Sequence, residues 1–507
     1  MVWGNPPPPL TSSPPRRLST SSVSSSDSSC SSPRLSALDS SSALILVHDE
    51  DDEISPFHFD SDDDEDDHTS QFDVRTPSTP PLGPTLVLLY LLVPYLKLGA
   101  MFLPHTETPL KYGLPSLFAF AGLAAFARQI LYMLSRYTRT AELEDVILDI
   151  CAKGRGRERR RSILRSITRA GTGGLRVLLA TVYLRESVQV LLPLLSNSKS
   201  TALRLGLTAI LAFAILPLSF AQSLGSKRLI FTTSLSVVTY IAWLACIVYA
   251  YVHRYPLANS GWLRTGTLWQ GIIAVAFAFT SSSTLSLYSS LRGSYHPVTT
   301  TKTSKFRSFK ALSVISITLA ILLTLPLVVF SANPHVPATL TTPRPPALFI
   351  IPILNAATLL LGIPALIVTT PTLPIPDRIR HSSTIPVSRT LLSILVTALA
   401  LVPAKVSTVF SDILLLCALT STYFLPALLH VVAHFFRRPL AIVVPQVPGT
   451  PAPGSQSPAD ELLLRKERAL QKKQFRKRIV WDLGVWLLLV GGGAGFVTAI
   501  GRVAGQW

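Results

Sequence analysis

Runs of about twenty apolar residues, repeated along most of the chain, limit more than any other feature what this sequence can fold into. At a helical rise of about 1.5 Å per residue, such a run crosses the roughly 30 Å hydrocarbon core of a bilayer. Charged residues make up only 15% of the chain and hydrophobic residues 48%, whereas a soluble protein carries about 25% charge. The pattern therefore predicts an all-α integral membrane protein.

The apolar runs predict about eleven transmembrane helices. The expected spans are residues 84–103, 114–135, 174–195, 203–222, 229–252, 266–290, 311–331, 347–370, 388–406, 408–436 and 479–500.

Basic residues between the spans predict the orientation. Every second loop is rich in Lys and Arg, and these loops (136–173, 223–228, 291–310, 371–389 and 437–478) hold about 30 of the 46 basic residues. Because cytosolic loops carry the excess of Lys and Arg, these loops and the N-terminus are expected in the cytosol. With eleven spans, residues 501–507 form a short lumenal or extracellular end.

Two terminal features complete the predicted domain organisation. Residues 1–82 are rich in Ser and Pro and then in Asp and Glu, a composition that cannot bury enough apolar surface to fold. We expect a disordered cytosolic tail there, which serves either phosphoregulation and sorting or only solvation. Residues 83–500 form the membrane domain.

Basic clusters at 155–161 and 461–478 lie in two of the predicted cytosolic loops. Beside a bilayer, such clusters contact anionic lipids. The net charge of +18 could also indicate nucleic-acid binding. Because the positive charge is divided among short loops between apolar runs, lipids are the expected partners and nucleic acid is not.

The membrane domain divides into two blocks of nearly equal length. Spans one to five cover 84–252, spans six to ten cover 266–436, and the span at 479–500 is extra. Five spans per block place the second block in the opposite orientation, which is the arrangement of five-plus-five inverted-repeat transporters. The first span of each block carries a possible break, at Pro94 to Ala100 and at Thr280 to Thr284. Hydroxyls that merely bend a helix are the alternative.

Ionisable groups within the spans are costly and therefore candidates for function. They are Lys97, Arg128, Arg185, Glu186 and Asp412. Glu186 could carry a proton or serve as a structural partner for an arginine, and Lys97 is long enough to reach the interface. The sequence contains no nucleotide-binding or hydrolase motif, and the membrane region contains no acidic metal cluster, so no enzyme activity, cofactor or metal is expected.

Several short motifs resemble the amino acid/auxin permease family, whose members have eleven spans. The similar stretches are Leu98-Gly99-Ala100-Met101-Phe102-Leu103-Pro104 with Tyr112–Pro115, Phe277–Ser283 with Leu285–Tyr288, and Asp412–Leu416 with Phe424–His430. Met101 stands where the family motif has a second glycine, and the usual histidine of the sixth span is missing.

The resemblance implies proton- or sodium-coupled movement of amino acids, and it favours the vacuolar membrane over the plasma membrane as the location. It implies substrate contacts at Leu98, Gly99, Ala100, Met101, Phe277, Phe279, Thr280, Ser281 and Ser282. Candidates for coupling are Glu186, Asn355 and Thr358.

Two other functions stay open at this point. A nutrient sensor or receptor that transports nothing would use the acidic tail and basic loops to recruit partners. A lipid-modifying membrane enzyme would need His430 and His434, which share a helical face but have no acidic partner nearby in the sequence. We expect a secondary transporter that works by alternating access.

Overall fold

The structure is a computed structural model of the 507-residue chain. It describes residues 81–138, 140, 142–152, 158–195, 201–221, 223–253, 268–281, 284–292, 308–332, 347–373, 386–436, 479, 481–497 and 500–501. All belong to the compact unit Asp66–Trp507, one of two in the chain. Residues 1–80 of the predicted disordered tail and the basic cluster at 461–478 lie outside the described residues. Leu82, the last residue of that predicted tail, is instead buried.

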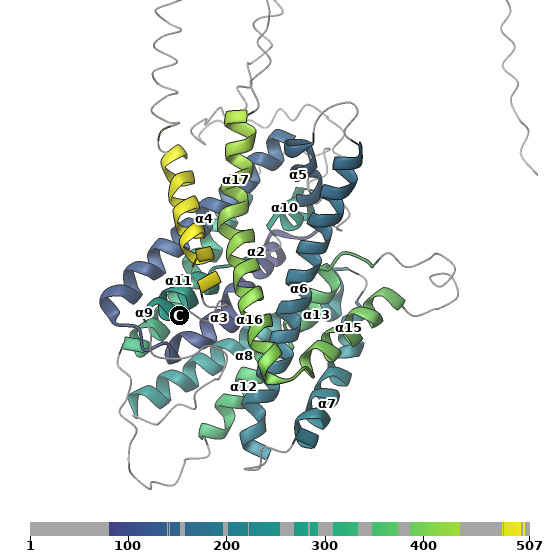
Figure 1. The fold of residues 1–507 in the computed structure, drawn as a ribbon. Helices are drawn as coiled ribbons and strands as arrows, with labels where there is room; N and C mark the ends of the chain where they lie inside the picture. The colour runs from purple at the N-terminus through teal and green to yellow at the C-terminus, as the bar shows by residue number, and fades with distance from the viewer. Residues whose placement is uncertain are drawn as a thin grey trace, which may run out of the picture. The chain divides into compact units, whose positions relative to one another are not determined.

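The regular elements within the described ranges are all helical (Figure 1). Eight segments are long and apolar enough to cross a membrane: Pro84–His105, Leu110–Thr138, Glu158–Leu195, Thr201–Ser219, Lys227–Val252, Phe309–Ala332, Phe349–Thr369 and Val406–His434. The predicted spans nine and eleven correspond to the shorter apolar helices Val387–Ala400 and Trp481–Val497, and span six corresponds to the two helices Leu268–Ala278 and Thr284–Arg292. The all-helical architecture is thus confirmed for the described residues, with eight candidate membrane-spanning helices, and the count of eleven stays a prediction.

The first span is interrupted. It consists of α2 (Pro84–Leu92), the 3₁₀ turn η2 (Val93–Leu96) and α3 (Leu98–Phe102). Pro94 has no N–H to donate and would clash with the carbonyl of residue 90 in an α-helix, so the α-helix ends before it. Lys97 separates the two parts, with φ −107° and ψ −146°, outside the helical region. The unwound backbone therefore centres on Lys97, within the predicted range Pro94 to Ala100.

The sixth predicted span is interrupted as well. α9 (Leu268–Ala278) and α10 (Thr284–Arg292) are separate helices. The Thr280 hydroxyl donates to the carbonyl of Phe277 at 2.8 Å, which satisfies an acceptor at the end of α9. This interruption lies where the Ser and Thr residues of the sequence predicted it.

Between and after these interrupted spans run the other helices. In the first block they are α4 (Leu110–Thr138), α5 (Leu143–Cys151), α6 (Glu158–Leu195), α7 (Thr201–Ser219) and α8 (Lys227–Val252). In the second block they are α11 (Phe309–Ala332), α12 (Ala347–Leu360), α13 (Ile363–Thr369), α15 (Val387–Ala400), α16 (Ala404–Leu419), the segment η5 (Thr420–Phe424), α17 (Leu425–Val431) and η6 (Val432–Phe436). A further apolar helix covers Trp481–Val497.

The tenth predicted span contains a π-helical turn, η5, between α16 and α17. Pro426 follows it, within the first turn of α17. Since proline has no N–H, the carbonyl of residue 422 loses its usual donor four residues later. A π turn accommodates this loss by inserting one residue into the helix, and it changes the direction in which Thr422 and Tyr423 point.

Helices of the first block pack against helices of the second. α4 packs against α9 and α11, α2 against α11, and α3 against α9. α12 packs against both α6 and α8, α6 also contacts α15 and α16, and α7 contacts α13 and α15. The buried core is continuous across both blocks, so the two halves form their interior together.

Candidate functional site

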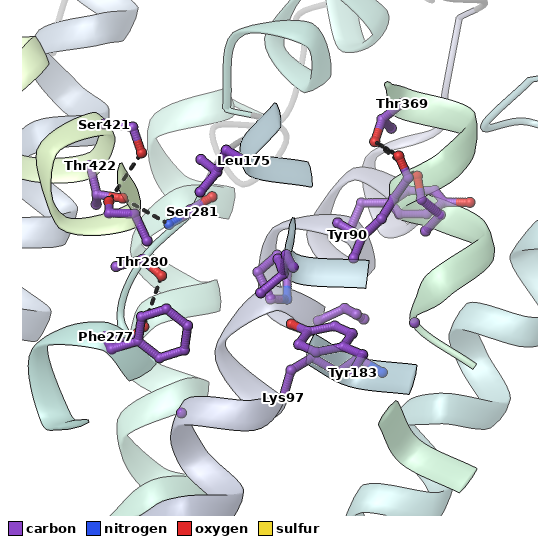
Figure 2. Close-up of a pocket in the computed structure, with 18 of the residues that line it drawn as sticks. Tyr90, Lys97, Leu175, Tyr183, Phe277, Thr280, Ser281, Thr369, Ser421 and Thr422 are labelled. Carbon is purple, nitrogen blue, oxygen red and sulfur yellow. Dashed lines mark hydrogen bonds between the residues drawn. The ribbon is translucent and has the colours of Figure 1, made fainter. Parts of the chain in front are cut away.

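A pocket lies between the two interrupted spans. Both contribute to its lining, together with α6, α13, α16 and the π turn η5 (Figure 2). Its polar lining residues are Tyr90, Lys97, Tyr183, Thr280, Ser281, Thr369, Ser421 and Thr422. These groups supply hydroxyls and one cation, and the lining contains no carboxylate side chain.

The two interrupted spans touch at Gly99. A Cβ added there would lie 2.5 Å from Cα and 2.7 Å from the backbone nitrogen of Ala278. Backbone atoms cannot move aside as a flexible side chain can, so only glycine permits this approach. Nearby, the rings of Tyr95 and Phe279 lie 5.5 Å apart, which joins the two interruptions by a second contact.

Arg128 on α4 binds both interrupted spans. Its guanidinium donates to the carbonyl of Leu91 at 3.0 Å and to the hydroxyl of Ser281 at 3.3 Å. It also donates to Ser316 on α11 at 3.0 Å and lies 4.6 Å from the ring centre of Tyr95. The planar fork of arginine makes several such bonds at once. Arg128 therefore fixes the position of one interruption relative to the other.

Lys97 does not reach the membrane interface, so the expectation that it extends there is wrong. The side chain is only 3% exposed. Its ammonium donates to the hydroxyl of Ser236 on α8 and to the carbonyl of Thr358 on α12 at 2.6 Å. A buried charge loses its hydrating water, and these two oxygens replace that water as hydrogen-bond acceptors.

The carbonyl of Thr358 can accept these bonds because α12 ends just beyond it. In an unbroken helix the amide of Gly362 would donate to Thr358. It donates instead to Leu359 at 3.0 Å, and α13 begins after the turn with a proline near its start. The freed carbonyl also accepts the Ser236 hydroxyl at 3.1 Å. The interruption at Gly362 thus creates the acceptor that holds Lys97.

The substrate residues named from the sequence fall into three groups. Gly99, Phe277, Thr280 and Ser281 line the pocket. Leu98, Ala100, Met101 and Phe279 are buried and are not among the lining residues. Ser282 lies outside the described residues.

The coupling candidates are likewise separated. Thr358 is bonded to Lys97 and lies beside the first interruption. Asn355, one helical turn earlier, has a buried side-chain oxygen without a hydrogen-bond partner among the described residues. Glu186 on α6 is 4% exposed, and its sequence neighbour Arg185 exerts an electrostatic effect on it. Neither Asn355 nor Glu186 lines the pocket.

Sequence reasoning missed two residues of the π turn. The hydroxyl of Thr422 accepts a bond from the backbone amide of Ser281 at 3.2 Å. The hydroxyl of Tyr423 donates to the carbonyl of Ala276 at 2.9 Å. Both bonds stabilise the non-helical backbone at the end of α9, because they pair groups that an unbroken helix would pair internally. Pro426 is the one local signal that could have indicated the turn, since it removes a helical donor.

The pocket extends toward one end of the helices. Its lining includes Tyr90 in the last turn of α2, Leu224 between α7 and α8, and Thr369 at the end of α13. In Figure 2, Thr369 and Leu175 lie at one side of the labelled set and Lys97 at the other. Toward the opposite end, Thr108 packs so tightly on Gly271 that any side chain there would clash. Thr108 and Gly271 are not among the residues that line the pocket.

No protein-family model matches this chain, and no curated protein matches it. Within the described residues, no group of three or more His, Cys, Asp or Glu side chains could hold a metal ion.

Proposed function

We propose that this protein is a secondary active transporter that moves amino acids across a membrane by alternating access. The observation that carries the proposal is the contact of two interrupted helices, one from each block, beside a pocket that both line. Interrupted spans are used by transporters because unwound backbone at mid-membrane can bind polar solutes. The backbone there is stabilised by Arg128, Thr422 and Tyr423.

The packing pattern supports a five-plus-five repeat. In such a repeat each span of the first block corresponds to the span five places later, so α2 corresponds to α9 and α4 to α11. The contact of α4 with α9 then has a counterpart in the contact of α11 with α2, and both contacts occur. The contact of α8 with α12 becomes that of α16 with α6, and the contact of α6 with α15 becomes that of α13 with α7. All of these pairs are in contact. Internal symmetry of this kind supports alternation of one block against the other.

An eleven-span topology predicts which side of the membrane the pocket faces. With the basic loops in the cytosol, the end that includes Leu224 and Thr369 faces the cytosol. The tight contact of Thr108 with Gly271 lies toward the opposite end, which supports an inward-facing arrangement. The vacuolar membrane, which the family resemblance implies, is the first location to examine.

The composition of the pocket supports a small polar solute with a carboxylate. Hydroxyl groups and the nearby ammonium of Lys97 can attract an anionic group, and α10 begins with its N-terminal end at the second interruption. Helix N-termini favour negative charge. The apolar lining, including Leu175, Leu179 and Phe277, can accept an aliphatic or aromatic side chain. Neutral amino acids combine these features.

The test is uptake by purified protein in proteoliposomes. A panel of radiolabelled amino acids is offered with an imposed pH gradient, with a sodium gradient, and with neither. We expect accumulation of a subset of neutral amino acids above the level of empty liposomes. Binding of an amino acid without flux would instead identify a sensor. Neither binding nor flux for the whole panel would contradict the proposal.

A further inference from the structure

We propose that Lys97 is the proton-coupling group of this protein, and that its ammonium takes the place that a free coupling cation would otherwise occupy. The inference rests on the proposed transport function. It resolves the choice between proton and sodium that the sequence left open. Lys97 is suited to the role by its position, its oxygen partners and its access to the pocket.

The position of Lys97 joins the interrupted first span to the rest of the fold. The residue belongs to the short link between η2 and α3, whereas Ser236 belongs to α8 and Thr358 to α12. These two helices pack against each other. A rearrangement of the first span relative to α8 and α12 therefore breaks the bonds of the ammonium group. Lys97 is thus linked directly to the conformational change that transport requires.

The ammonium of Lys97 is held by oxygens and not by a carboxylate. Its hydrogen bonds go to one hydroxyl and one carbonyl, and no carboxylate of the described residues forms an ion pair with it. Because the ammonium has no negatively charged partner, its charged form is stabilised in the interior by these two oxygens. When they move away, the ammonium releases one proton to water in the pocket and becomes a neutral amine. When they return, the amine takes up one proton from water.

The surroundings contain few other groups that could titrate. The described residues of α3, α9, α12 and α13 carry no ionisable side chain. The ionisable groups on the other adjacent elements are Tyr90 on α2, Tyr95 on η2, Glu158, Arg159, Arg160, Arg161, Arg165, Arg169, Arg176, Tyr183, Arg185 and Glu186 on α6, and Lys227, Arg228, Tyr240, Cys246, Tyr249 and Tyr251 on α8. Glu186 is the alternative proton carrier that the sequence suggested, but it does not line the pocket, whereas Lys97 does.

Sodium and the ammonium would compete for the same oxygens. Hard cations bind carbonyl and hydroxyl oxygens, which are the groups that Lys97 already uses. Gly362 shows how closely the side chain fits, because a Cβ added there would lie 3.0 Å from Cε and 3.1 Å from Nζ of Lys97. We therefore expect a sodium gradient to have no effect on transport by the unmodified protein.

Transport by Lys97→Gln in proteoliposomes tests the proposal. Counterflow, the exchange of solute on the two sides without a gradient, is compared with accumulation driven by a pH gradient. We expect at least tenfold less pH-driven accumulation in Lys97→Gln, and the counterflow that remains should not change with pH. Lys227→Gln, which removes an exposed lysine from α8, should change neither measurement.

Three results would overturn the assignment. They are pH-driven accumulation that persists in Lys97→Gln, sodium-driven accumulation by the unmodified protein, and the absence of any flux in the unmodified protein. The third result also rejects the transport function, whereas the first two reject the role of Lys97 alone. If Lys97→Gln shows no counterflow, Ser236→Ala decides. Its counterflow should persist while the pH dependence of accumulation shifts by about one unit, and an unshifted profile rejects the proposal.

Discussion

At the scale of single residues, Gly99 has the strictest requirement. Its missing side chain allows the first interrupted span to approach the backbone of Ala278. Gly122 on α4 offers a comparison, because a Cβ added there would meet nothing within 4 Å.

We expect Gly99→Leu to abolish uptake in proteoliposomes. A leucine would force the two interruptions apart, and overpacking of this kind costs about 1–3 kcal/mol or more. Gly122→Leu should retain most of the uptake, because its new side chain enters open space. Equal uptake by the two variants would mean that the close contact of the interrupted spans is not needed for transport.

Arg128 is the second residue whose replacement should affect transport strongly. Loss of a hydrogen bond to a charged group costs about 1.5–3 kcal/mol, so Arg128→Gln should lower the uptake rate by at least about tenfold. Arg128→Lys keeps the charge but cannot bridge Leu91, Ser281 and Ser316 together, and should be nearly as impaired. The control is uptake by Arg136→Gln, which removes an exposed arginine from the same helix. Normal uptake by Arg128→Lys would show that charge alone suffices.

At the scale of the helical elements, the π turn η5 positions groups that support the second interruption. Pro426→Ala restores a backbone donor, so the helix can close into a regular α-helix. Removal of the inserted residue would rotate Thr422 and Tyr423 away from α9. We expect at least a tenfold loss of uptake together with an unchanged or higher unfolding temperature. Pro193→Ala, near the end of α6, serves as the control. An unimpaired Pro426→Ala protein would make the π turn dispensable.

The elements were more predictable from the sequence than the site was. Length and apolarity indicated the spans, and the Ser and Thr run after Phe279 indicated the second interruption, because both signals are local. The first interruption lies at Lys97, within the predicted range Pro94 to Ala100, whereas Gly99 belongs to α3 and serves close packing. Thr422 and Tyr423 could not be found, because their partners are more than a hundred residues away in the sequence.

The partners of Lys97 were also beyond reach of the sequence. Its long aliphatic stem is compatible with an interface position as well as a buried one. The decision depends on the carbonyl of Thr358, which is available only because the amide of Gly362 donates to Leu359. Such a rearrangement at the end of α12 depends on tertiary structure, and the order of residues alone does not specify it.

At the scale of the whole molecule, the topology can be tested with cysteines. Cys151 is exposed, whereas Cys246 and Cys417 are partly buried. In a Cys30→Ser protein, a membrane-impermeant maleimide should label Cys151 from the cytosolic side only. Lys111→Cys, an exposed site at the start of α4, should be labelled from the opposite side only. Labelling of both sites from one side would contradict the alternation of loops.

The position of Lys97 also has an electrical consequence. The corresponding interruption in the second block contains no charged residue between positions 266 and 291, so the two halves differ by one ionic group. If a zwitterionic solute moves together with one proton on Lys97, each turnover carries one net positive charge across the membrane. A membrane potential contributes about 2.3 kcal/mol per charge for each 100 mV. Voltage would then drive the carrier alongside the pH gradient, and transport would generate a measurable current.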